Sequence, residues 1–111
     1  MDNLTVTDNA PAHRFEARAD DGTVLGFVAY DIEAAARLQG EADAVVVTHT
    51  QVDPQYEGQG VGATLARGAL DLIRESGRGV VPLCPFVSAY IRRHPEYQGM
   101  VQLEQDTGQG G

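Results

Sequence analysis

Glycines at positions 58, 60 and 62 follow an apolar, β-branched run and come directly before a helical pattern. A strand that delivers a glycine-rich turn to a helix start builds a site for anions. The first helical N–H groups have no intrahelical acceptor, and the helix dipole favours negative charge there. Glycine also lets a phosphate approach the main chain without meeting a Cβ atom. The spacing therefore predicts a phosphorylated ligand at this turn.

Three classes of glycine-rich loop are candidates for this turn. A Walker loop requires a lysine, and the chain contains none. A dinucleotide fingerprint is matched by Gly58, Gly60 and Ala63, but it expects an acidic residue about 20 positions later, where the chain has only an apolar run. The acyl-coenzyme A loop, Gln/Arg-x-x-Gly-x-Gly/Ala, is matched by Gly60 and Gly62, with Glu57 at its first position. A plain strand-to-helix turn without a ligand is the remaining alternative.

Four strings extend the pattern beyond the loop, in this order: His49-Thr50-Gln51-Val52, Glu57-Gly58-Gln59-Gly60-Val61-Gly62, Pro82-Leu83-Cys84-Pro85-Phe86-Val87, and Tyr90-Ile91 with Arg93-His94-Pro95-Glu96-Tyr97. From about Arg14 to Val101 the chain resembles the small, single-domain branch of the GNAT N-acetyltransferase superfamily, the YjdJ-type acetyltransferases. The resemblance implies that acetyl-CoA binds and that an amine is acetylated, but it names no acceptor. The residues expected to contact the cofactor are Val52, Glu57, Gly58, Gln59, Gly60, Val61, Gly62, Cys84, Tyr90 and Arg93.

Length and composition set limits on the class of protein. A chain of 111 residues has room for one domain, assigned to residues 1–111, with the ends at 1–11 and 102–111 expected to be flexible. No apolar stretch approaches the ~20 residues of a membrane span, and the first residues lack a signal-peptide pattern. One cysteine cannot form an internal disulfide, which fits a reducing compartment. We therefore expect a cytoplasmic protein without a membrane partner.

The charge is distributed unevenly along the chain. The net charge of −8 results from 16 acidic residues and 8 arginines, and residues 1–57 hold 11 of the acids but only 3 of the arginines. An acidic surface repels nucleic acid, whose binding depends on basic side chains that neutralise phosphates. The same surface would attract a basic amine or polyamine, although solubility alone also explains the charge. We expect no nucleic-acid partner.

The elements that position the glycine turn follow from periodicity. Alternating patterns predict strands at 13–19 and 23–32 around the turn Asp20-Asp21-Gly22, with residues 33–43 as a loop or single turn. A third strand at 44–52 precedes a helix at 60–76 that ends at Gly77 in a left-handed conformation. A buried strand at 79–84 leads to a second helix at 86–93, with Pro85 in its first turn and Pro95 after its end.

This order predicts an α+β fold. An antiparallel meander is followed by a right-handed β-α-β crossover with parallel pairing. The resemblance implies a compact GNAT-like arrangement, in which the two strands that flank the main helix splay apart and admit the cofactor. Ligands of parallel strands bind outside their carboxyl ends, so this position is also expected on general grounds.

Acetyl transfer to an amine requires a neutral amine, a polarised carbonyl group and a proton for the leaving thiolate. Tyr90 lies one helical turn beyond the strand that carries Cys84 and is the candidate proton donor, with a purely structural core role as the alternative. Main-chain N–H groups near Val52 are candidates for polarising the carbonyl. His49 is the histidine in a strand interior and the candidate general base, unless it is only hydrogen-bonded beside the sheet.

Cys84 has two possible roles. Its thiol could accept the acetyl group as a nucleophile, or it could be a small apolar residue in the wall of the site. His13, His49 and His94 are too scattered along the chain to suggest a metal site, so no metal is expected. Family members often carry an acid where this chain has Gln51, and an amide is not a useful base.

Two functions therefore remain open at this stage. The first is an acetyl-CoA-dependent N-acetyltransferase that acts on a small-molecule amine or an exposed lysine. The alternative is an acyl-CoA-binding module with little or no catalysis, which the amide at Gln51 and the small size of the chain favour. Neither the acceptor nor the oligomeric state can be predicted from these residues.

Overall fold

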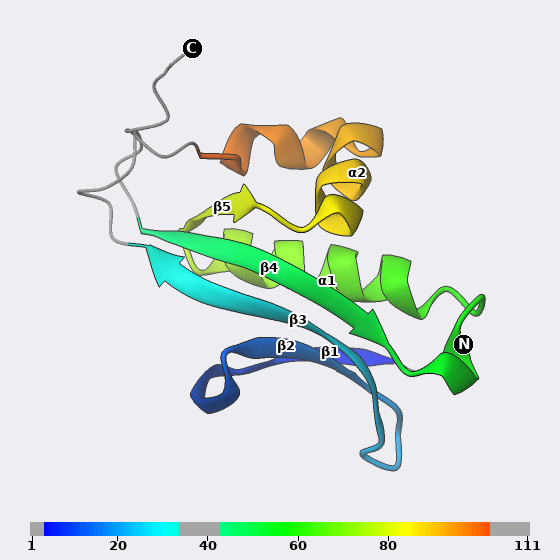
Figure 1. Cartoon of the computed structure of the whole chain (residues 1–111). Helices are drawn as coiled ribbons and strands as arrows, with labels where there is room; N and C mark the ends of the chain where they lie inside the picture. Colours follow the sequence, from blue (N-terminus) through cyan, green and yellow to red (C-terminus); the bar gives the residue numbers. More distant parts are fainter. Residues whose placement is uncertain (1–3, 34–42, 103–111) are drawn as a thin grey trace.

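Five strands form one mixed sheet in the order β1-β2-β3-β4-β5. The computed structural model of the chain describes residues 4–33 and 43–102. The first four strands pair antiparallel, whereas β4 and β5 pair parallel with α1 between them in the chain (Figure 1). The strands are β1 Thr5–Asn9, β2 Arg14–Arg18, β3 Val24–Glu33, β4 Ala44–Val52 and β5 Gly79–Pro82.

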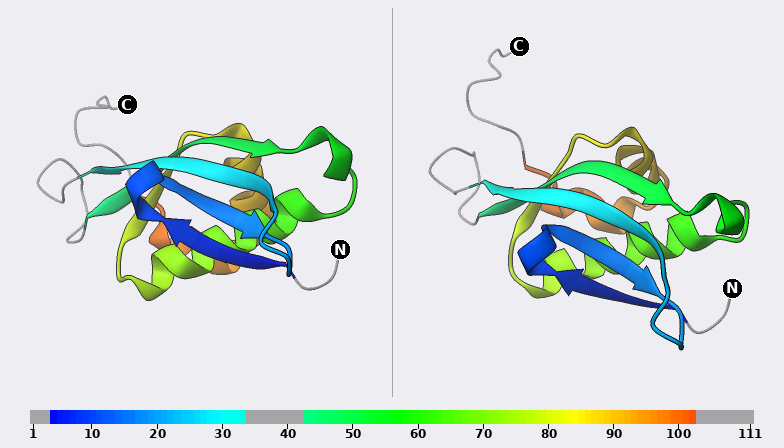
Figure 2. Two further views of the ribbon diagram at one scale, coloured as in Figure 1. Left: turned by 90° about the horizontal axis from the view of Figure 1, so that it is seen from below. Right: turned by 60° about the horizontal axis from the view of Figure 1, so that its bottom comes forward.

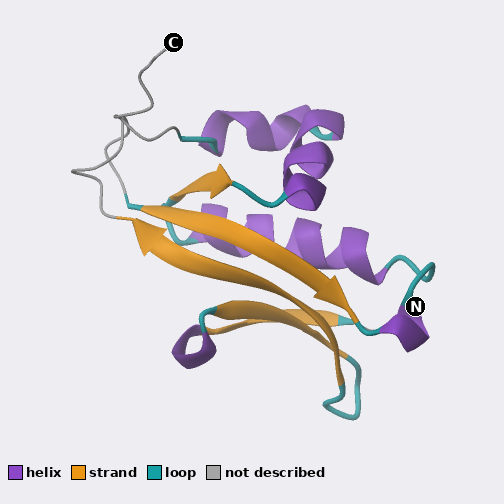
Figure 3. Ribbon diagram, viewed as in Figure 1, coloured by secondary structure: helices purple, strands orange, loops and turns teal. Residues whose placement is uncertain are grey.

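Both α-helices pack on the same side of the sheet. Helix α1, Val61–Glu75, contacts all five strands, and α2, Pro85–Arg93, contacts β4, β5 and α1. Figure 2 shows α1 behind the layer of strands, and Figure 3 separates the helical layer from the strand layer by colour. Three short 3-10 helices complete the described structure: η1 Ala10–Ala12, η3 Pro54–Tyr56 and η4 Pro95–Met100.

The core fills the space between this sheet and α1. The helix buries a stripe that includes Val61, Leu65 and Ile73, at helical spacing. The sheet contributes residues of alternate strand positions, such as Phe15 and Val28, which lie opposite each other on β2 and β3. Removal of this apolar surface from water is the main favourable term in folding. The α+β class, with a meander followed by a β-α-β crossover, is confirmed.

The predicted element ends are close to those observed. Helix α1 begins at Val61 after Gly60, which is left-handed, and Gly77 after its last turn has a φ of 80° as expected. Helix α2 begins at Pro85 itself. Strand β5 ends at Pro82, two residues before the predicted end, because the chain turns away there to enter α2.

The expectation of a flexible lead at 1–11 is wrong for β1. Its five residues include a single apolar side chain, that of Val6, so the sequence shows neither an apolar run nor the alternation of a half-buried strand. Tertiary contacts hold the strand: Val6 packs over Gly68 of α1, where an added Cβ would lie 2.5 Å from the Val6 side chain. The Tyr30 hydroxyl donates to Asp8 Oδ1 at 2.7 Å. Burial, together with this carboxylate, raises the pKa of Tyr30 to about 12, so the hydroxyl remains a donor.

The other segments expected to be irregular lie largely outside the described residues. Of the predicted loop at 33–43, the structure describes only Glu33, which ends β3, and Asp43. Of the tail at 102–111, it describes Gln102, whose N–H donates to the Val80 carbonyl at 2.8 Å. Val101 also bridges Val80. The expectation of flexibility is therefore wrong for Gln102, which is bound to the edge of β5.

The two parallel strands differ in length, and this difference opens the sheet. The last parallel partners are Val47 of β4 and Pro82 of β5. The N–H groups of Leu83 and Cys84 both donate to the Val47 carbonyl, each at 3.0 Å, and the chain then leaves the sheet. Strand β4 continues to Val52. The splayed strands implied by the resemblance are therefore present.

A buried carboxylate ties the N-terminal strands together. The side chain of Glu16 is 1% exposed on the sheet face opposite α1. It accepts hydrogen bonds from Arg14 Nε at 2.7 Å, from Asn9 Nδ2 at 3.1 Å and from an Nη group of Arg18. Burial alone would raise the pKa of Glu16, but the hydrogen bonds from Asn9, Arg14 and Arg18 outweigh it and lower the pKa below its usual value.

We predict that Glu16→Gln lowers the free energy of unfolding by about 1–3 kcal/mol at neutral pH, because Asn9, Arg14 and Arg18 lose a charged, buried acceptor. The folded-state pKa of Glu16 is lowered, so its contribution is complete above the unfolded value of about 4.3 and is lost as pH falls below it. Urea unfolding at several pH values measures this difference. Glu75→Gln, at the exposed end of α1, is the control and should change stability little. A Glu16 effect that does not shrink in acid would contradict the assignment.

Candidate functional site

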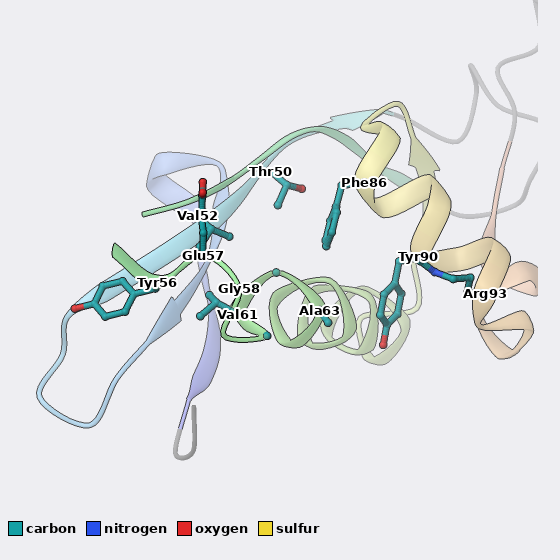
Figure 4. Close-up of a pocket in the computed structure, with 12 residues that line it drawn as sticks. Thr50, Val52, Tyr56, Glu57, Gly58, Val61, Ala63, Phe86, Tyr90 and Arg93 are labelled. Carbon is teal, nitrogen blue, oxygen red and sulfur yellow. The ribbon is translucent and has the colours of Figure 1, made fainter. Parts of the chain in front are cut away.

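A cavity of about 450 Å³ opens where β4 extends beyond β5. Three segments surround it: the end of β4, the turn that leads into α1, and the inner side of α2 (Figure 4). Its position at the carboxyl end of a parallel strand is where α/β sheets usually bind ligands. The lining residues are Thr50, Val52, Tyr56, Glu57, Gly58, Gly60, Val61, Gly62, Ala63, Phe86, Tyr90 and Arg93.

The glycine turn presents open main chain to this cavity. Gly58 and Gly60 both have a φ of 82°, which glycine adopts without strain. An added Cβ at either residue would meet no atom within 4 Å. Helix α1 has no side-chain N-cap bond and no acidic residue in its first turn. Thr64 N–H donates to the Gly60 carbonyl, so the N–H groups of the turn before Thr64 can donate to an anion.

Gly62 is needed for a different reason. It lies within the first turn of α1, and an added Cβ would lie 2.9 Å from Phe86 Cζ. Phe86 belongs to the first turn of α2 and is 39% exposed. The absence of a side chain at Gly62 therefore lets the ring of Phe86 reach the start of α1 and form one wall of the cavity.

The edge of β4 offers free main-chain groups to the same cavity. Asp53 N–H donates to the Leu25 carbonyl at 2.8 Å, so the main chain of Asp53 faces β3. Main-chain direction alternates along a strand, and Thr50 and Val52 therefore direct their N–H and C=O groups toward the other edge. Within the described chain, β5 supplies no partner there because it ends opposite Val47.

A bulge precedes this free edge. Ala29 pairs with His49 and Tyr30 pairs with Val47, so Thr48 is an extra residue on β4. The Thr48 hydroxyl donates to the Ala29 carbonyl at 3.3 Å. Bulges bend a strand and change the direction of neighbouring groups, and they are frequent beside active sites.

Tyr90 forms the wall of the cavity contributed by α2. Its ring stacks on His94 with 4.0 Å between the ring centroids, and it is 7% exposed. Burial raises the pKa of Tyr90, so the hydroxyl stays protonated at neutral pH. The following segment is anchored to α1, because the Tyr97 hydroxyl donates to Asp71 Oδ1 at 2.8 Å. This contact fixes the far end of the wall.

Cys84 lies behind the wall and outside the cavity lining. The residue is 4% exposed and precedes the first residue of α2. Its Sγ atom lies 3.2 Å from Thr50 Oγ1, and either atom can be the donor. Thr50 does line the cavity, so Cys84 contacts the site through this hydroxyl.

His49 lies on the opposite face of the sheet. The register pairs Val28 with Thr50 and Ala29 with His49, which puts Thr50 on the core face and His49 on the outer face. His49 is exposed, and its Nε2 atom lies 3.3 Å from Gln51 Oε1. The main chain of β4 thus lies between the cavity and the side chain of His49.

The structure brings together most of the residues expected to contact a cofactor. Of these, Gln59 and Cys84 lie outside the lining, and Gln59 Nε2 donates to the Gln55 carbonyl at 3.3 Å. His49, the candidate base, also lies outside it. Four lining residues were missed: Thr50, Tyr56, Ala63 and Phe86. Thr50 and Phe86 lie within strings that had been singled out, and alternation along the strand could have indicated that Thr50 shares the face of Val52.

Metal ligation and membrane spanning are two further properties that side-chain grouping and helix length can indicate. Among residues 4–33 and 43–102, no group of three or more histidine, cysteine or acidic residues could hold a metal ion. No helix in this part of the chain has the length and apolar character needed to cross a membrane.

Comparisons with known proteins bear on the fold and on the family of the chain. The NMR solution structure of a GCN5-like protein from Staphylococcus aureus is similar to this chain, with a TM-score of 0.59 and 22% identity, over 97% of this chain and 98% of that chain. At this identity the similarity concerns the fold. None of the curated proteins matches the chain. The model of the GCN5-related N-acetyl-transferase family matches residues 14–100, and the protein therefore belongs to the GCN5-related N-acetyltransferase family.

Proposed function

We propose that the protein transfers the acetyl group of acetyl-CoA to an amine. One observation carries this proposal: the start of α1 and the free edge of β4 face the same cavity (Figure 4). The start of α1 offers N–H groups to a diphosphate, and the edge of β4 offers main-chain groups to the amides of a pantetheine arm. Family membership makes acetyl-CoA the first cofactor to test.

The residues present fit coenzyme A. The open space beside Gly58 and Gly60 admits phosphate oxygens to the helix start. Thr50 and Val52 can pair with an extended, amide-bearing arm in the way that an edge strand pairs with a peptide. Arg93 lines the cavity from α2 and supplies a cation. Glu57 is exposed, and its charge opposes a phosphate by only about 1 kcal/mol at 4 Å in water.

Tyr90 is the proposed proton donor in the chemical step. Acetyl-CoA supplies an activated thioester, and the amine displaces a thiolate that requires a proton. Because burial raises the pKa of Tyr90, this hydroxyl retains its proton at the pH of the reaction. The main-chain N–H groups of Thr50 and Val52 are the candidates for polarising the thioester carbonyl.

His49 is the proposed base for the acceptor. It lies on the outer face, one strand away from the cavity, and contacts Gln51 there. An amine that approaches from this side would meet the thioester at the free edge of β4 without entering the cofactor cavity. The neutral imidazole would take a proton from the ammonium form of the amine.

The alternative function is a module that binds acyl-CoA without catalysis. Two observations favour it: Gln51 cannot accept a proton usefully, and His49 is exposed to solvent rather than enclosed with the thioester. The two functions share the cofactor site and differ in the step that follows binding. Titration with acetyl-CoA, coenzyme A and NAD by calorimetry tests the shared part.

We predict that Gly60→Val lowers the affinity for coenzyme A by at least several-fold, because a side chain would occupy the open space at the helix start. The left-handed backbone also becomes strained, at a cost of about 1–2 kcal/mol in stability. Gly77→Val is the matched control, since Gly77 has nearly the same φ at the other end of α1. Calorimetry should show weaker binding for the first variant alone. If Gly60→Val and Gly77→Val both fold and bind coenzyme A with equal affinity, the diphosphate binds elsewhere.

We predict that Tyr90→Phe lowers turnover by about 10-fold to 100-fold, because the leaving thiolate loses its proton donor. The apolar ring contacts remain, so the affinity for coenzyme A should change less than 2-fold by this reasoning. Release of thiol in steady-state kinetics measures the rate, and calorimetry measures the affinity. Unchanged turnover would assign Tyr90 a structural role.

We predict that His49→Gln lowers turnover by about 100-fold, because the base is removed. Thiol release in steady-state kinetics measures the loss, and an unchanged rate would assign His49 a structural role.

We predict that Cys84→Ala keeps coenzyme A binding and a sizeable part of the activity, because Cys84 contacts the cavity through Thr50. Calorimetry measures the binding and thiol release measures the activity. An acetylated Cys84 that turns over when amine is added would reverse the assignment for the thiol.

A further inference from the structure

A second cavity lies on the outer face of the sheet, behind the same segment of β4. Its volume is about 250 Å³, and Gln51 and Asp53 are among the residues that line it. Thr50 and Val52, the alternate residues of the same segment, line the cofactor cavity. The two cavities therefore lie on opposite faces of the same segment of β4, and the outer one also borders β3 through residues such as Leu25 and Phe27. His49, the proposed base, lies on this outer face, with 6.2 Å between the centroids of its ring and that of Phe27.

A fixed arginine forms one side of the outer cavity. Arg14 Nε donates to Glu16 at 2.7 Å, and its guanidinium lies over the ring of Phe27 with 4.6 Å to the ring centroid. Glu16 is buried and held on its other side by Arg18. Among the described residues no other group holds the Nη atoms of Arg14. The guanidinium is thus held in position by two contacts while the Arg14 side chain remains 37% exposed, which suits it to bind a carboxylate.

An acidic group lies on the other side of β3. Arg14 belongs to β2, whereas Asp53 follows β4, and both line the cavity across the intervening strand. Asp53 Oδ1 accepts the Gln55 N–H at 3.0 Å, which fixes its side chain. A cation and an anion separated by one strand complement a molecule that carries an anion and an ammonium group. The volume is below that of pockets for drug-sized ligands, which start at about 300 Å³.

We propose that the outer cavity is the acceptor site and that it selects a small amine that carries a carboxylate, as a free amino acid does. This inference rests on the proposed acetyl transfer for its chemistry. Arg14 binds the carboxylate, Asp53 attracts the ammonium group, and Gln51 belongs to the segment of β4 whose alternate residues line the cofactor cavity. In the reaction the ammonium group loses one proton to His49, the neutral nitrogen forms a bond to the acetyl carbon, and the bond from that carbon to sulfur breaks. The sulfur leaves as a thiolate that takes a proton from Tyr90, and the nitrogen releases its second proton to water.

The test compares three acceptors of matched structure with saturating acetyl-CoA. These are an α-amino acid, its carboxamide and the corresponding decarboxylated amine, and kcat/KM is measured by thiol release. The wild-type protein should prefer the amino acid by on the order of 10-fold to 100-fold, the range expected for a charge-assisted contact. Equal use of the three acceptors would overturn the selection of a carboxylate while leaving acetyl transfer intact.

Two variants separate the role of Arg14 from its structural contacts. Arg14→Gln and Arg18→Gln each remove one partner of Glu16, but Arg18 does not line the cavity. The preference for the amino acid should disappear in Arg14→Gln, through a higher KM, and persist in Arg18→Gln. If both variants lose the preference equally, or neither does, the proposal is wrong.

Binding without cofactor distinguishes this proposal from the proposed function. The amino acid is titrated into the protein alone and followed by NMR amide shifts. Shifts at Phe27, Gln51 and Asp53 that vanish in Arg14→Gln support the acceptor site, even if acetyl-CoA fails to bind or react. Shifts confined to other residues, or none at millimolar concentrations of the amino acid, count against it.

Discussion

The Val47 carbonyl determines where the sheet opens. It accepts the N–H groups of both Leu83 and Cys84, and this double acceptance ends the parallel pairing of β4 and β5. The chain can then enter α2 at Pro85, which needs no N–H partner at a helix start. The last part of β4 is left with main-chain groups that β5 does not use. Buried or half-buried groups of this kind require partners, so the open edge can pair with a ligand.

The rest of the site is arranged around that edge. Helix α1 directs its N-terminus toward it, because the glycine turn reverses the chain in a short distance after β4. Helix α2 closes the third side, and its position depends on the close approach of Phe86 to Gly62. The outer face of β4 carries a second set of polar side chains, including His49 and Gln51. One strand thus separates two chemical environments, an inner apolar cavity and an outer polar surface.

The sequence was sufficient for those parts of the fold that local patterns determine. The glycine turn, the two helices and the parallel strand could be predicted because Gly60, Gly77 and Pro85 mark their ends. Strand β1 could not, since Thr5–Asn9 has no apolar run and depends on partners far along the chain. The same holds for the bulge at Thr48, which exists only relative to β3. Most residues that line the inner cavity were in the predicted segments, whereas the outer cavity combines β2, β3 and β4 and has no signature in any one segment.

The pairing of Gln102 with β5 affects how molecules of this protein meet in solution. A short parallel strand at the margin of a sheet exposes unpaired groups that can recruit another chain. Here Val101 and Gln102 bind along Val80, so part of that margin is already occupied by the molecule's own chain. At the opposite margin, β1 is short and polar and contains Asp8. Neither margin presents a long apolar template, which disfavours addition of strands from neighbouring copies during folding and storage.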